Sequence, residues 1–256
     1  MVTLKKDWEI DIMRQAGRIV ASVLELLRER IQPGIDTASL DEAASELIER
    51  SGGIPAFKGY TMLGCPIPFP GALCISINEE VVHGIPSRER LLREGDIVSV
   101  DVGVLYKGYY GDAACTYPVG KISSRKEALL KVTLESLHRA IAAAQEGKTL
   151  GDVGHAIESY AISQGFSLVR NYCGHGIGRK LHEPPQVPNY GRPGNGVTLK
   201  KGMTIAIEPM VLSGGEDVVT LSDRWTVVTA DGADAAHFEH TVLVTDGEAE
   251  ILTPWE

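Results

Sequence analysis

The sequence has few cysteines, and none of them lie in the pairs that build a disulfide framework or a zinc ribbon. Its four cysteines are scattered over 256 residues, without a Cys-x-x-Cys pair. This distribution favours a reducing compartment, so we expect a cytoplasmic protein. An apolar run of about 18 residues is also absent, as is an apolar stretch at the N-terminus, so we expect neither a membrane-spanning helix nor a signal peptide.

Basic residues are in the minority, with 25 Lys and Arg against 34 Asp and Glu and a net charge of -9. Such a balance disfavours binding to nucleic-acid phosphates, so we expect no direct nucleic-acid substrate. Transient ribosome association, if it occurs, would depend on a local basic patch. The 43% hydrophobic and 23% charged content is that of a globular protein, and we take a monomer as the default.

No linker or low-complexity segment divides the chain, so we expect a single domain over residues 1–256. Apolar residues at helical spacing predict helices from an N-cap at Asp7 to before Pro33, around residues 40–48, over about 125–145 and over about 152–164. Strands are predicted at 73–77, 204–207, 218–221, 225–228 and 239–244, with a hairpin of 96–105 and 109–119. The order helix, helix, strands occurs twice, which predicts an α+β fold with a mixed or antiparallel sheet.

The chain also shows weak internal similarity. Residues 94–101 resemble residues 201–208, and His83-Gly84-Ile85 recurs as His175-Gly176-Ile177. The matching segments follow one another in the same order in both halves. We therefore predict two pseudo-repeats, roughly 7–120 and 125–250, related by a pseudo-two-fold axis.

Four carboxylates interrupt strongly apolar strand-like runs: Asp101, Asp112, Glu208 and Glu239. Each could face solvent from a half-exposed strand, but a carboxylate on a buried face is costly unless it is paired or metal-bound. In a hairpin that turns at residues 106–107, Asp101 would lie directly opposite Asp112. The second half supplies the other two carboxylates, so the duplication would gather all four at one centre.

Four carboxylates carry a charge that two divalent cations would balance. Carboxylate ligands with one or two histidines suit Co²⁺, Mn²⁺, Fe²⁺ or Zn²⁺. Two such ions lower the pKa of a shared water and so present a nucleophile at neutral pH. The expected chemistry is hydrolysis of a carbonyl or phosphoryl substrate.

Glycine-rich surroundings set His83 and His175 apart from the other histidines, because a bare backbone lets an imidazole approach a metal or substrate closely. His182 follows seven residues after His175. We interpret His138, His155 and His240 as structural or solvated. The chain has no H-E-x-x-H, G-x-S-x-G, Walker A or EF-hand motif that would point to another chemistry.

Several short motifs occur in a fixed order along the chain: CISINEEVVHGIP at 74–86, DVG at 101–103, GD at 111–112, GHGIG at 174–178, IEPM at 207–210 and FEHT at 238–241. Together these segments resemble type I methionine aminopeptidases, which are metallopeptidases of the pita-bread or creatinase-like fold. The resemblance extends over almost the whole chain, from about Ile10 to Thr253. The resemblance implies duplicated αβ halves around a curved, largely antiparallel sheet, in the short form without an N-terminal zinc-finger extension.

The resemblance also implies roles for particular residues. Two divalent metal ions would be bound by Asp101, Asp112, His175, Glu208 and Glu239. A hydroxide activated by both metals would attack the carbonyl of an N-terminal methionine in peptides and nascent chains. His83 and His182 would contact the substrate, and Glu208 would shuttle a proton. The methionine pocket would be formed by Tyr60, Phe69, Cys74, His83 and Trp225, with Phe57 and Leu181 nearby, and the cleft would admit only a small second residue.

Two features depart from the family pattern. The connection Thr61–Pro68 is longer than usual, which would reshape the pocket rim, and Leu181 stands where an aromatic residue is common. A proline-specific or creatinase-like peptidase shares the fold and is the main alternative function. A second alternative is an interaction protein that has lost catalysis, although the presence of all five metal ligands argues against it.

Overall fold

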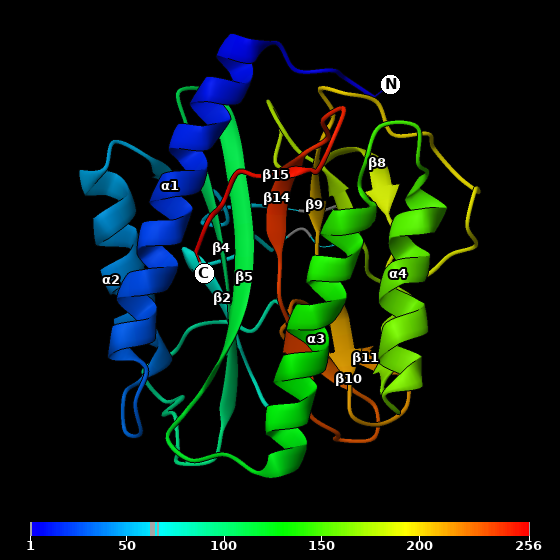
Figure 1. Cartoon of the computed structure of the whole chain (residues 1–256). Helices are drawn as coiled ribbons and strands as arrows, with labels where there is room; N and C mark the ends of the chain where they lie inside the picture. Colours follow the sequence, from blue (N-terminus) through cyan, green and yellow to red (C-terminus); the bar gives the residue numbers. More distant parts are fainter. Residues whose placement is uncertain (1, 62–64, 66, 256) are drawn as a thin grey trace.

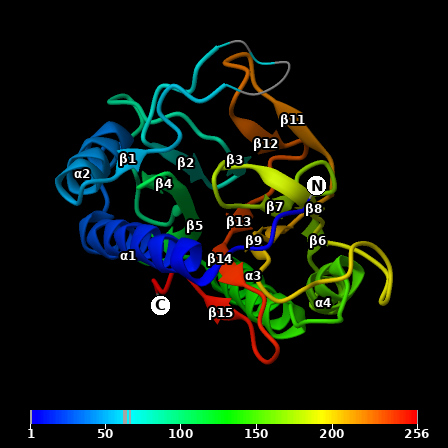
Figure 2. The same cartoon turned by 90° about the horizontal axis from the view of Figure 1, so that it is seen from above.

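The computed structural model describes residues 2–61, 65 and 67–255. Within them, four α-helices confirm the predicted helical segments: α1 (Asp7–Arg30), α2 (Thr37–Arg50), α3 (Ser124–Ala143) and α4 (Leu150–Ser163). Seen from above, α1 and α2 lie beside one half of the molecule and α3 and α4 beside the other (Figures 1 and 2). None of the helices in these described ranges is long and apolar enough to cross a membrane.

Two details of the helices differ from the prediction. Asp7 is the first helical residue of α1 and not its N-cap, because the Lys6 N–H is satisfied by the Glu9 carboxylate at 2.8 Å. On α3 the buried face includes the polar residues Thr133 and Ser136, whereas the apolar Leu130 is only half-buried. Polar residues are tolerated there because both hydroxyls donate to helix carbonyls four residues earlier, at 2.7 and 2.8 Å.

The first half of the chain builds a four-stranded antiparallel sheet. It consists of β1 (Ile54–Pro55), β2 (Leu73–Ile77), β4 (Ile97–Tyr106) and β5 (Tyr109–Pro118), with β4 between β2 and β5 for most of its length. Helix α1 packs across β4 and β5. Burial on both sides explains why β4 is almost continuously apolar. Its polar exceptions are Ser99, which is hydrogen-bonded to Thr116 on β5, and Asp101, which lines the site.

The β4–β5 hairpin turns one residue later than predicted. Lys107 and Gly108 have φ of 47° and 84°, the left-handed pair that a two-residue hairpin turn of type I′ requires. Asp112 therefore pairs with Gly103, and Asp101 pairs with Ala114, so the prediction that the two aspartates lie directly opposite each other is wrong. They are diagonal neighbours on the same face of the hairpin, which still places their side chains within reach of each other.

The second half of the chain contributes a five-stranded antiparallel sheet and most of two smaller sheets. The larger sheet has the order β15 (Glu250–Ile251), β14 (His240–Leu243), β9 (Thr204–Ile207), β7 (Gly174–Gly176), β8 (Glu183–Val187). One smaller sheet joins β13 (Ala235–His237), β10 (Met210–Leu212) and β6 (Ser167–Leu168). The other joins β11 (Val218–Thr220), β12 (Val227–Thr229) and β3 (Glu80–Val82), which comes from the first half.

Hydrogen bonds along β5 join the two halves. The Glu239 N–H donates to the Ala114 carbonyl at 2.9 Å, and the Thr241 hydroxyl donates to the Asp112 carbonyl at 2.8 Å. Farther along β5, the Thr116 hydroxyl donates to the His237 carbonyl at 2.8 Å. This seam brings the carboxylate of Asp112, on β5, close to the carboxylate of Glu239 in the second half.

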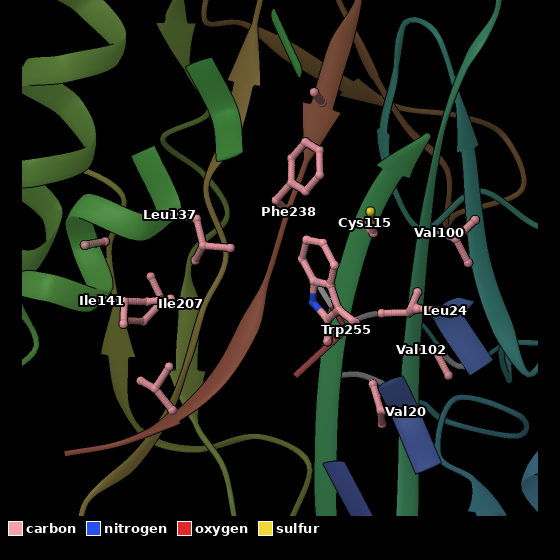
Figure 3. Packing of buried hydrophobic residues seen from close by; sticks show 14 of the residues in the cluster. Val20, Leu24, Val100, Val102, Cys115, Leu137, Ile141, Ile207, Phe238 and Trp255 are labelled. Carbon is pink, nitrogen blue, oxygen red and sulfur yellow. The ribbon is translucent and has the colours of Figure 1, made fainter. Parts of the chain in front are cut away.

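The main hydrophobic core lies between the helices and these strands. Figure 3 shows Val20 and Leu24 of α1 on one side, Leu137 and Ile141 of α3 on the other, and Trp255 between them. The Trp255 indole N–H donates to the Glu239 carbonyl at 3.0 Å. The C-terminal segment thus helps to fix the backbone of a site residue from the core side.

Candidate active site

One cavity of about 280 Å³ gathers every residue that the sequence singled out for a metal or substrate role. The predicted metal ligands in its lining are Asp101, Asp112, His175, Glu208 and Glu239, and the predicted substrate contacts are Tyr60, Phe69, Cys74, His83, His182 and Trp225. They come from strands, strand ends and loops of both halves. Phe57 and Leu181, expected nearby, line the cavity too.

The carboxylates and one imidazole meet where the strands of the two halves converge. Ligand atoms of Asp112, His175 and Glu239 lie within 4.8 Å of one another. His175 Nε2 is 3.7 Å from Asp112 Oδ2 and 3.6 Å from Glu208 Oε1. His175 Nδ1 lies 3.0 Å from the Gly176 carbonyl, which fixes the proton on Nδ1 and leaves the Nε2 lone pair facing the carboxylates.

Burial makes this cluster electrostatically unfavourable without a cation. It raises the pKa of Asp101 to about 7. Burial, reinforced by the neighbouring carboxylates, raises the pKa of Asp112, Glu208 and Glu239 well above the usual range. Burial, with His182 nearby, lowers the pKa of His175 to about 3, so the imidazole is neutral and able to bind a metal.

The donor set fits divalent cations. Buried oxygens of Asp101, Asp112 and Glu239 have no hydrogen-bond partner among the described residues. Buried carboxylate oxygens are normally hydrogen-bonded, and orphaned ones call for a compensating ion or proton. Several carboxylates with a neutral imidazole are the ligands that borderline divalent metals accept.

Another part of the cavity lining is apolar and aromatic. Phe69 and Trp225 meet edge to face with ring centroids 5.2 Å apart. Trp225 is held in place because its indole N–H donates to the Ile67 carbonyl at 3.0 Å. Cys74 is buried beside them, and burial raises the pKa of its thiol well above the usual range, so the thiol is neutral and contributes an apolar surface.

His182 and His83 also line the cavity, and each contacts an aromatic ring. The Tyr60 hydroxyl lies 2.7 Å from His182 Nδ1, and the His182 ring lies 4.2 Å from the His175 ring, centroid to centroid. Burial lowers the pKa of His182, and burial with His182 nearby lowers the pKa of His83 to about 4. Both rings are therefore neutral at physiological pH.

Sequence reasoning missed His237. It lines the cavity, is 2% exposed, and its Nε2 lies 3.7 Å from Glu208 Oε2. The sequence could have suggested His237 because it lies two residues before Glu239. That indication is weak, since β13 ends at His237 and Glu239 lies outside the strand. The lining also includes residues to which the sequence gave no role: Val82, Tyr172, Cys173 and Met210.

The other expectations have simpler outcomes. His240 is fully buried and stacks on Trp255 at 4.7 Å between centroids, which confirms a structural role, and His155 is exposed. The predicted insertion Thr61–Pro68 lies partly outside the described residues, which omit 62–64 and 66. Its described part includes the buried Cys65 and Ile67, whose carbonyl accepts the indole N–H of Trp225.

Known proteins with the same arrangement identify the family. The model of metallopeptidase family M24 matches residues 11–246. The chain is 50% identical to methionine aminopeptidase 1 of Bacillus subtilis over 253 residues, which cover 99% of each chain. It is also 50% identical to the methionine aminopeptidase of Thermotoga maritima, whose crystal structure superposes with a TM-score of 0.95 and 99% coverage of both chains.

A more distant solved structure shares the fold alone. Prolidase from Pyrococcus furiosus matches with a TM-score of 0.78 at 24% identity, over 99% of this chain and 66% of the prolidase. These likenesses confirm the predicted α+β pita-bread fold with its largely antiparallel sheet. Because the family model covers most of the chain and the Bacillus relative is matched over nearly its full length, the chain belongs to metallopeptidase family M24.

Proposed function

We propose that this protein is a metal-dependent methionine aminopeptidase that removes the N-terminal methionine from peptides and nascent chains. The observation that carries the proposal is one cavity lined both by a carboxylate–imidazole centre and by aromatic and sulfur-containing side chains. An unbranched thioether side chain suits such a lining because sulfur makes favourable contacts with aromatic rings. The relatives named methionine aminopeptidase support the same activity.

Two divalent ions would be held by Asp101, Asp112, His175, Glu208 and Glu239, with Co²⁺, Mn²⁺, Fe²⁺ and Zn²⁺ as candidates. When bound, they supply Lewis-acid polarisation of the scissile carbonyl and a water of lowered pKa. Support comes from the orphaned carboxylate oxygens and from the neutral state of His175. The close spacing of Asp112, His175 and Glu239 would suit ligands of a shared metal centre.

The protein's own groups would orient the substrate around this centre. A phenol that donates to His182 Nδ1 leaves Nε2–H as the donor on the other side of the ring, suited to a carbonyl oxygen that gains negative charge. The carboxylate of Asp101 offers a counter-ion for the free α-amine. Glu208, between His175 and His237, would carry a proton to the leaving amine.

Peptide assays test the proposed activity. The protein loaded with Mn²⁺ or Co²⁺ is expected to release methionine from Met-Ala-Ser and to leave an Ala-Pro peptide intact. The aromatic residues would contact the first side chain of the substrate, and alanine is too small to fill that pocket. A Met-Leu-Ser peptide should be cleaved more slowly, since the chain after methionine must pass the carboxylates. Cleavage of the Xaa-Pro peptide alone would replace the proposal by a proline-specific peptidase, and cleavage of neither would favour a non-catalytic protein.

We further propose that the protein acts as a cytoplasmic monomer made of pseudo-repeats at about 7–120 and 125–250. Support for the repeats comes from the matching sequence segments and from the seam along β5 that joins the two halves. Nascent chains would be met in transient encounters with ribosomes. Sedimentation of the purified protein with and without ribosomes tests both its oligomeric state and this association.

Replacing Tyr60 by Phe is expected to lower kcat for Met-Ala-Ser several-fold, with a smaller change in KM. The loss of the hydroxyl removes the bond to His182 Nδ1, a net interaction of about 1 kcal/mol, and frees the ring to adopt the other tautomer. Steady-state kinetics checks the result. Tyr106→Phe, on the opposite side of the β4–β5 hairpin turn from Tyr109, is the matched control, and an equal loss in both variants would contradict the role of Tyr60.

A further inference from the structure

The turn that carries His83 is held in a conformation that an L-residue rarely adopts. His83 has a φ of 61°, in the left-handed region that persists only where the surrounding structure imposes it. Its Nδ1 is buried without a hydrogen-bond partner in the described part of the chain. The ring packs against Tyr172 and Trp225 with centroids 5.8 and 6.1 Å away. With no bond at Nδ1, the place of the imidazole depends on these ring contacts and on the backbone of the turn.

The backbone around His83 has no space to relax. The Ile75 N–H donates to the Gly84 carbonyl at 2.8 Å, and the Gly84 N–H donates to the Ser76 hydroxyl at 3.1 Å. A Cβ added at Gly84 would lie 2.1 Å from the Ile75 carbonyl oxygen. The turn at His83-Gly84 is therefore packed tightly against β2. A group that fixes the Ile75 carbonyl also restricts Gly84, the residue after His83.

Arg90 holds this turn at three points. Its Nη1 donates to the carbonyls of Ile75, at 3.0 Å, and Ile85, at 2.5 Å. Its Nη2 pairs with the carboxylate of Glu80, which also accepts the Ile77 N–H at 2.9 Å. One guanidinium thus connects β2, the start of β3 just before His83, and the chain just after His83.

The geometry of this clamp calls for arginine. A guanidinium presents several donors in a rigid plane, whereas the ammonium of lysine is a compact point charge on a flexible stem. The backbone of Arg90 is anchored separately, since its carbonyl accepts the Thr37 N–H at 2.9 Å. A change of the side chain therefore releases the turn without detaching this segment from α2.

We propose that Arg90 is a positioning residue for His83, and that its three-point clamp holds the turn so that the imidazole stays in the substrate cavity. The inference rests on the proposed function, because it takes His83 to contact the substrate. Arg90 is not in the lining of the cavity, so any effect on the reaction is indirect. We assign it to His83 because the clamp holds residues on both sides of it.

A double-mutant cycle tests this inference. Arg90→Lys in the metal-loaded enzyme is expected to lower kcat/KM for Met-Ala-Ser about tenfold, mainly through a higher KM, because a substrate contact is displaced. In the His83→Ala background the same change is expected to alter kcat/KM less than twofold, because residues that act together are not additive. An equal tenfold loss in both backgrounds would show a general structural role and overturn the inference, as would no loss in either.

The controls separate this inference from the proposed function. Arg88→Lys alters a neighbouring arginine whose ion pairs with Glu42 and Asp36 lie at the surface, and it should leave kcat/KM unchanged. If wild type does not cleave Met-Ala-Ser, the proposed function fails. If wild type cleaves it and His83→Ala does so equally well, the role of His83 is wrong and the inference falls with it.

A second variant serves if Arg90→Lys does not fold, as judged by circular dichroism and metal content. Glu80→Gln keeps an acceptor for the Ile77 N–H but removes the charge that orients Nη2. It should lower kcat/KM in the wild-type background about threefold and have no effect in the His83→Ala background. Equal losses in the two backgrounds would again contradict the inference.

Discussion

Asp112→Asn is expected to lower kcat/KM for Met-Ala-Ser by about 10³-fold or more, because a metal centre contributes several kcal/mol to stabilising the transition state. Asp112, His175 and Glu239 have ligand atoms within 4.8 Å of one another, and Asp112 Oδ2 is 3.7 Å from His175 Nε2. Asparagine keeps the shape of the side chain but removes its charge and one acceptor oxygen. Steady-state kinetics and the number of ions bound per chain, measured after equilibration with Mn²⁺ or Co²⁺, check the result.

The folded structure should survive this substitution. The backbone of Asp112 is held by Thr241 through bonds of 3.2 and 2.8 Å that asparagine preserves. Removing one of several crowded, buried carboxylates should leave the metal-free variant at least as stable as the metal-free wild type. Asp246→Asn changes an exposed aspartate paired with Lys201 and is the matched control. Wild-type activity in Asp112→Asn would refute the site.

The carboxylates could be recognised from the sequence because their cost is a local property. Asp101 interrupts the apolar residues of β4, and Glu208 directly follows the apolar strand β9. A buried charge at such a position needs a compensating partner, whatever the register of the strands. That argument does not depend on the exact register. The carboxylates therefore line one cavity although the β4–β5 turn is shifted by one residue, a shift decided by the left-handed conformations of Lys107 and Gly108.

His237 and Arg90 could not be recognised in the same way. His237 reaches the cavity because β10 and β13 pair Met210 with it, a long-range contact that leaves no periodic signal. Arg90 lies in a polar loop, where an arginine is ordinary, and its importance comes from two carbonyls that converge only after the chain folds back. Buried hydroxyls on α3 escaped for a similar reason, since their bonds to helix carbonyls make polar residues fit a core face.

Removal of metal is expected to abolish activity and to lower the melting temperature together. Without a cation, the buried carboxylates raise one another's pKa and must either take up protons or repel. Metal that binds only the folded state adds about 2.7 kcal/mol at 100 times Kd, or about 5–10 °C in Tm for a domain of this size. Chelation followed by dialysis, and then titration with Mn²⁺ or Co²⁺, measures both quantities on one sample.

The titration also counts the ions. With two ions per chain and protein well above Kd, activity should level off near two equivalents, whereas a single site would reach its plateau at one. Tm should continue to rise slowly with free metal beyond that point. Asp112→Asn should show a smaller rise in Tm than wild type, because one candidate ligand has lost its charge, and Asp246→Asn should rise as wild type does. Unchanged activity and Tm after chelation, with metal loss confirmed by elemental analysis, would mean that the carboxylates are compensated by protons and that hydrolysis does not depend on this centre. Since protons would also satisfy the orphaned oxygens of Asp101, Asp112 and Glu239, this measurement distinguishes the two ways in which the fold can tolerate so much buried negative charge.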